Sequence, residues 1–125
     1  MQMEVLETLS KKNAIQLFEI LANRQNIHEN QFTKKQYYSA LQALKRSALI
    51  TQTKPYSLTT FGRIVYSSIL LLDKAVKSSP HLRAIDILFD KHQEEIESSM
   101  KTNIINALIE DAELKKILLG TIKKL

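Results

Sequence analysis

Glycine and proline, the two residues that most often end helices and form tight turns, occur only twice each among the 125 residues. A chain with so few of them has little from which to build long loops, glycine-rich phosphate-binding loops or many-stranded barrels. Apolar residues make up 44% of the chain and charged residues 25%, which is ordinary for a compact globular domain. The sequence therefore predicts a mostly helical protein with one buried core.

Several function classes are excluded by what the sequence lacks. There is no cysteine, which rules out disulfides, thiolate metal sites and a cysteine nucleophile. The first twelve residues are polar and do not have the pattern of a signal peptide. The longest apolar run, around residues 68–72, is much shorter than the roughly 20 residues that span a bilayer. We therefore expect a soluble, cytoplasmic protein that does not contact a membrane.

Two segments in the first half of the chain have the apolar spacing of helices. Residues 11–22 have one wide apolar face, and Ser10 is a suitable N-cap. Residues 23–32 lack a regular period and are expected to form a loop. Thr33 is the expected N-cap of a second helix, KKQYYSALQALKRSA. The expected apolar stripe of this helix is Tyr37, Leu41, Leu44 and Ala48.

The pattern changes directly after this helix. In the segment LITQTKPYSLT, β-branched residues flank Lys54 and Pro55, and Pro55 suits a turn. The short runs on either side resemble strands, so we expect a small β-hairpin here.

The second half of the chain is expected to be helical. Thr59 or Thr60 is the expected N-cap of a long helix over residues 61–77, which Ser78, Ser79 and Pro80 should end. Three further helices are expected over about 81–100, 102–109 and 111–122.

Positive charge is concentrated in one part of the chain. Residues 33–77 contain eight basic residues and one acidic residue, whereas the residues from 78 onward contain seven basic and eight acidic residues. A local field of this sign attracts polyanions, usually nucleic acid or an anionic membrane. The alternative is an ordinary solvated basic surface.

A helix followed by a basic helix and a hairpin is the order found in DNA-binding motifs, whose second helix enters the major groove. Because the apolar stripe of helix 34–48 must face the core, its other face is left to polar side chains that suit base edges and phosphates. Glutamine pairs with adenine, and arginine or lysine pairs with guanine. The candidate DNA-binding residues are Lys34, Lys35, Gln36, Tyr38, Ser39, Gln42, Arg46 and Lys54. Two of these residues also have an interpretation without DNA contact. Tyr38 could simply lie at the edge of the domain, and Lys54 could be an ordinary exposed lysine in a turn.

The segments KKQYYSALQALKRSALI and YSLTTFGRIVYSSI resemble those of winged helix-turn-helix transcriptional regulators, in particular small archaeal ones, over about residues 12–77. In such proteins the recognition helix ends in a small residue followed by Leu and Ile, and the hairpin forms the wing. The segment after the wing resembles Tyr-x-Leu-Thr-x-x-Gly-x-x-Val-Tyr. The matching positions are Ala48, Leu49, Ile50, Tyr56, Leu58, Thr59, Gly62, Val65 and Tyr66.

Two departures from this pattern concern the backbone. Ala48 stands where these regulators usually have a glycine, so a left-handed backbone conformation costs more free energy at this position. The segment before the recognition helix, NRQNIHENQF, lacks the apolar stripe of a regular helix. The resemblance implies a mostly α fold with a small β-hairpin wing, a winged helix-turn-helix followed by C-terminal helices.

Helix 61–77 is apolar on nearly all sides, so it must be covered both by the winged domain and by either the helices after Pro80 or a second subunit. We expect residues 1–77 to form the DNA-binding domain and residues 78–125 to form a helical extension that dimerises. The expected function is sequence-specific binding of double-stranded DNA by a homodimeric transcriptional regulator. The sequence names no effector.

The enzyme alternative has little support. His28, His81 and His92 are dispersed, and no recognised nucleophile motif is present. The acidic segment around His92, which contains Asp90, Glu94, Glu95 and Glu97, is expected to be a solvated helix face rather than a metal site. We expect no catalytic residue, metal or cofactor.

The rival to DNA binding is a winged helix used as a protein-interaction module that meets an acidic partner. A protein-binding face would carry more exposed apolar or aromatic anchors. The polar face at Gln36, Ser39 and Gln42 therefore favours DNA.

Overall fold

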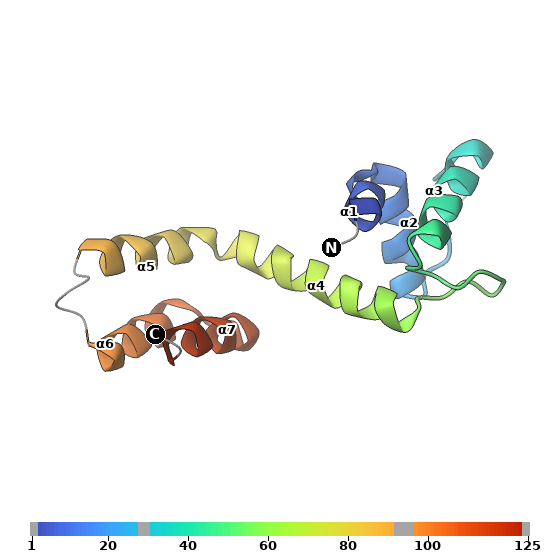
Figure 1. Ribbon diagram of the computed structural model, residues 1–125. Helices are drawn as coiled ribbons and strands as arrows, with labels where there is room; N and C mark the ends of the chain where they lie inside the picture. Colours follow the sequence, from blue (N-terminus) through green and yellow to red (C-terminus); the bar gives the residue numbers. More distant parts are fainter. Residues whose placement is uncertain (1–2, 28–30, 92–96, 124–125) are drawn as a thin grey trace. The chain divides into compact units, whose positions relative to one another are not determined.

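The computed structural model describes residues 3–27, 31–91 and 97–123, and that part of the chain contains seven helices (Figure 1). The chain divides into two compact units, Met1–Ser68 and Ile69–Leu125. The long helix α4, Thr60–Lys77, begins in the first unit and ends in the second. No helix among the described residues is long and apolar enough to cross a membrane.

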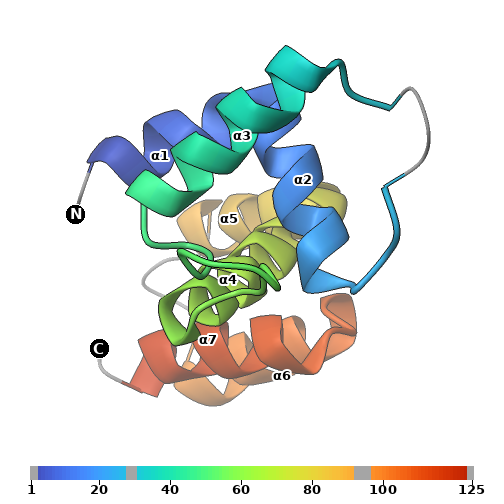
Figure 2. The same ribbon diagram turned by 90° about the vertical axis from the view of Figure 1, so that its right-hand side faces the viewer.

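The first unit contains α1 (Met3–Ser10), α2 (Lys12–Ala22), α3 (Lys34–Arg46) and the start of α4. Helix α2 packs against both α1 and α3 (Figure 2). The ring of Phe18 lies edge to face with that of Tyr66 on α4, with 5.9 Å between centroids. The largest side chains that this unit buries fully are Leu17, Phe18, Leu44, Leu49 and Ile50.

Helix α1 was not expected from the sequence. Its place depends on a buried pair of hydroxyls, because Thr8 Oγ1 and Ser47 Oγ are hydrogen-bonded at 2.6 Å. Ser47 Oγ also donates to the Ala43 carbonyl of α3 at 3.0 Å. Buried polar groups are costly unless they are paired, so this network ties α1 to the end of α3.

Helices α2 and α3 end in the same way, with a left-handed residue that is not glycine. At the end of α3, Ala48 has a φ of 59°. Its N–H donates to the Lys45 carbonyl and the Leu49 N–H donates to the Leu44 carbonyl, which is a Schellman motif. Arg24 has a φ of 53° at the end of α2. The alanine in the place of the expected glycine thus adopts the left-handed conformation that the turn requires.

The expected β-hairpin after α3 is wrong. The described residues contain no strand, and Ile50 and Leu58 form only an isolated antiparallel bridge. The Thr51 hydroxyl accepts a hydrogen bond from the Ser57 N–H at 3.2 Å and also lies near the carbonyls of Thr53 and Pro55. Because these side-chain bonds close a loop, the ladder does not continue beyond the bridge. The mostly α part of the expected fold is confirmed, but a wing is not seen.

The connection between α2 and α3 also differs from a helix-turn-helix. Residues 23–33 separate the two helices, which is longer than the three to four residues of that motif. The described part of this connection contains no helix, as expected for residues 23–32.

Helix α4 begins where the chain returns to α3. Thr59 is its N-cap, since its hydroxyl accepts a hydrogen bond from the Gly62 N–H at 2.9 Å and donates to the Ala48 carbonyl at 2.7 Å. Gly62 is buried against the backbone of Leu49, and a Cβ at this position would overlap the Leu49 carbonyl. The start of α4 therefore packs on the end of α3 with no side chain between the two backbones.

The second unit contains the rest of α4 with α5 (Ser79–Lys91), α6 (Ser98–Leu108) and α7 (Ala112–Lys123). The expected helix over about 81–100 is wrong at its end, because Ser98 already begins α6. Pro80 does not prevent α5 from starting at Ser79, since the first turn of a helix tolerates proline. The buried core of this unit consists of Ile85, Ile105, Ile109 and Leu114.

Asp111 caps α7 and joins it to α4. Its carboxylate accepts a hydrogen bond from the Leu114 N–H at 3.0 Å and pairs with Lys74 Nζ at 3.2 Å. The backbone hydrogen bond from Leu114 is the main cause that lowers the pKa of Asp111. The hydrogen bond with Asp111 likewise raises the pKa of Lys74.

We expect Gly62→Ala to lower the free energy of unfolding by about 1 to 3 kcal/mol, because the new methyl group overlaps the Leu49 backbone. Gly120→Ala on α7 is the matched control. Nothing lies within 4 Å of a Cβ there, so this substitution should stabilise by about 0.5 to 1 kcal/mol through helix propensity. Urea denaturation followed by circular dichroism measures both effects. A Gly62→Ala variant as stable as the parent would contradict the close packing of α4 on Leu49.

Candidate nucleic-acid interface

One face of α3 is exposed and polar along its whole length. The exposed side chains recur at spacings of three and four residues, which places them on one side of the helix. The opposite side is buried, and Leu41 and Leu44 are among its members, as expected. Tyr37 is half-buried and Ala48 is exposed, so these two contribute less to the core than expected. We call the exposed side of α3 the reading face. Its residues are Lys35, Tyr38, Ser39, Gln42 and Arg46.

Two candidates at the start of α3 lie apart from the middle of the reading face. Lys34 is exposed at the first position of the helix. Gln36 takes part in a capping box: its side-chain oxygen accepts a hydrogen bond from the Thr33 N–H at 2.9 Å, and its own N–H donates to Thr33 Oγ1 at 3.1 Å. The expected N-cap, Thr33, is confirmed, and Gln36 has a structural role in addition to its exposure.

Tyr38 is the aromatic residue of the reading face, with 53% of its surface exposed. Its ring lies edge to face with that of Tyr37, at 5.4 Å between centroids. The half-buried Tyr37 therefore supports the exposed ring.

Lys54 lies in the loop over residues 51–57, which extends away from the helices of the first unit (Figure 1). Two contacts fix this loop to the end of α3. Gln52 Nε2 donates to the Lys45 carbonyl at 3.0 Å, and Lys45 Nζ lies 4.7 Å from the centre of the Tyr56 ring. Lys54 is thus exposed on a loop whose base is held by the same helix that carries the reading face.

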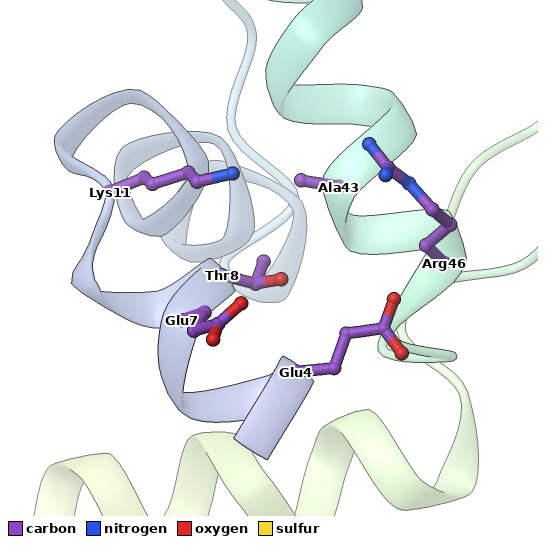
Figure 3. Close-up of a pocket in the computed structure, with 6 residues that line it drawn as sticks. All are labelled: Glu4, Glu7, Thr8, Lys11, Ala43 and Arg46. Carbon is purple, nitrogen blue, oxygen red and sulfur yellow. The ribbon is translucent and has the colours of Figure 1, made fainter. Parts of the chain in front are cut away.

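Acidic residues border the end of the reading face. A hollow of about 70 Å³ lies between α1 and α3 and is lined by Glu4, Glu7, Lys11 and Arg46, among others (Figure 3). Figure 3 shows Glu4 and Arg46 on neighbouring walls of this hollow. Its volume suits a few water molecules, so it is too small for an organic cofactor. The carboxylates offset part of the positive field at this end of α3.

A larger groove, of about 340 Å³, lies between α2 and the start of α3. Lys11 and Lys12 line its α2 side, while Lys35 and Ser39 line its α3 side. Sequence reasoning did not select Lys11 and Lys12. The available signal was the adjacent pair of lysines at the start of the helix expected over residues 11–22.

The positive charge of the chain belongs to the first unit. Residues 1–68 contain nine basic and four acidic side chains, whereas residues 69–125 contain nine of each. The net charge of +5 is therefore that of the unit that contains α3.

No group of three or more histidine, aspartate or glutamate side chains that could hold a metal is present among residues 3–27, 31–91 and 97–123. His28, His92, Glu94 and Glu95 lie outside the described residues.

Gln36→Ala and Gln42→Ala should separate structural from binding roles on α3. The first substitution removes half of the capping box and should lower the free energy of unfolding by about 0.5 to 1 kcal/mol. The second removes an exposed side chain and should change it by less than about 0.5 kcal/mol. A Gln36→Ala variant as stable as the parent in urea denaturation would show that the capping box does not stabilise α3.

Comparisons with protein-family models, with curated proteins and with solved structures found no match to this chain.

Proposed function

We propose that the protein binds double-stranded DNA sequence-specifically through the reading face of α3 and acts as a transcriptional regulator. The observation that carries this proposal is a helix anchored in the core on one side and lined on the other by cationic, amide and hydroxyl groups. Sequence is read in the major groove by such groups on a helix, which fits there with its side chains.

The length of the reading face suits one stretch of major groove. Lys35 and Arg46 are eleven residues apart, which corresponds to about 16 Å along a helix at 1.5 Å per residue. At 3.4 Å per base pair this distance covers about five base pairs. Gln42 lies between the two cations and is suited to a bidentate contact with adenine. The exposed Lys54 and the hydroxyl of Tyr38 are suited to backbone contacts at the edges.

The rigidity of α3 supports this role. Its start is fixed by the capping box of Thr33 and Gln36, and its end by the left-handed turn at Ala48. A helix held at both ends presents its backbone in one arrangement, which lowers the backbone entropy lost on binding.

We expect Gln42→Ala and Lys35→Gln to weaken DNA binding in different ways. Loss of a bidentate base contact should cost about 1 to 3 kcal/mol at the preferred site and little on random duplex. Loss of a phosphate contact should weaken binding to all duplexes and reduce the slope of log affinity against log salt by about 0.9. Site selection from a random duplex library, followed by fluorescence anisotropy at several salt concentrations, measures both. A parent protein without affinity for any duplex would overturn the proposal.

We further propose that the protein is a homodimer through α4. Leu72 and Val76 form an apolar stripe on the part of this helix that belongs to the second unit, and both side chains are exposed, by 64% and 63%. A two-fold partner that presents the same stripe would cover it and bring two reading helices into one complex. A twofold-symmetric site would then supply two contacts for one binding event.

Sedimentation equilibrium at micromolar concentration should return about twice the chain mass of 14.4 kDa. Leu72→Glu should shift the mass towards that of a monomer, because a carboxylate cannot be buried in the apolar stripe. Leu70→Glu is the control, since Leu70 is exposed on the opposite side of α4 and should leave the dimer intact. A parent that stays monomeric would remove the dimer and leave the role of α3 untouched.

A further inference from the structure

We propose that the groove between α2 and α3 binds a backbone phosphate of the duplex that α3 reads, with Lys12 and Lys35 as its principal contacts. This inference rests on the proposed function and adds a phosphate-binding site at the edge of the reading face. Lys11 and Lys12 become DNA contacts through it.

The chemistry of the groove is cationic on both sides. Lys11, Lys12 and Lys35 line it, and its remaining lining includes Asn13, Gln36 and Ser39 but no carboxylate. Lys12 and Lys35 are exposed, and neither has an ion-pair partner in the part of the chain that the structure describes. Unpaired ammonium groups with hydroxyl and amide donors beside them suit a phosphate.

The place of the groove fits a duplex bound to α3. Lys35 and Ser39 belong both to the groove and to the reading face, so the groove opens at the edge of that face. A helix about 10 Å wide nearly fills a major groove about 12 Å wide, which brings the flanking phosphates close to both sides of the helix. Since α2 packs against α3, its first lysines reach one of these two strands.

The other hollow beside α3 shows why the phosphate belongs at this end. The hollow between α1 and α3 is lined by Glu4 and Glu7 beside Arg46, and these two carboxylates would repel a phosphate. Lys11 lines both spaces, whereas Lys12 lines only the groove between α2 and α3. A substitution of Lys12 therefore tests the groove alone. The two ends of α3 thus differ in charge, and the tighter backbone contact lies at the end with Lys12 and Lys35.

The test uses the full chain with Lys12→Gln, which keeps a polar side chain of similar helix propensity but removes its charge. Lys116→Gln, at an exposed position on α7 in the second unit, is the matched control. Affinity for a random duplex and for the selected site is measured by fluorescence anisotropy between 50 and 200 mM salt. Circular dichroism checks that each variant keeps its helices.

Lys12→Gln should reduce the slope of log affinity against log salt by about 0.9 on both duplexes and leave the ratio between their affinities unchanged. Lys116→Gln should change neither quantity. An unchanged slope for Lys12→Gln, with a reduced slope for Lys35→Gln, overturns the groove site and leaves the proposed function in place. A changed affinity ratio assigns Lys12 to base reading and also overturns it. A parent that binds no duplex removes both the site and the proposed function.

Discussion

The chain reversal at the end of α3 is the constraint on which the first unit depends. Ala48 takes a left-handed conformation there, which turns Leu49 and Ile50 into the core. Every other helix of the unit is tied to this short segment or to the helix it ends. Helix α1 reaches it through the hydrogen-bonded hydroxyls of Thr8 and Ser47, and α4 starts on it through the Thr59 cap. The close approach at Gly62 leaves no room for another arrangement. One strained residue is thus maintained because three helices meet around it.

This reversal also determines how the proposed interface is held. Because the buried side of α3 is anchored at Leu41 and Leu44, its polar side has to face outward. The loop that carries Lys54 begins directly after the reversal and is fastened back to the Lys45 carbonyl. The groove beside α2 follows from the packing of α2 on the same buried side. The parts that would meet DNA therefore share one support, and a change at the reversal would displace all of them together.

The sequence predicted the elements whose stability is mainly local or that have long apolar periods. Helices α2 and α3 and the Thr33 cap are of this kind. Helix α1 was missed because so short a segment, half of it polar, shows little helical period, and it owes its position to burial of Val5 and Thr8 by other segments. The hairpin was wrongly expected because β-branched residues favour strands, whereas the Thr51 hydroxyl closes a loop instead. The exposed face of α3 was predictable from its period. The capping role of Gln36 and the lysines of the neighbouring groove depend on contacts that periodicity does not reveal.

The unequal charge of the two units has a consequence for the encounter that precedes any contact. A polyanion exerts a net pull on a unit of charge +5 and almost none on a unit with nine charges of each sign. Near a polyanion the molecule would therefore experience a torque, and the unit with α3 would arrive first. Such orientation raises the fraction of productive collisions, and it weakens as added salt shortens the Debye length to about 8 Å at physiological ionic strength. Recognition by this protein would thus begin as a long-range electrostatic alignment, to which the second unit, with no net charge, would contribute little.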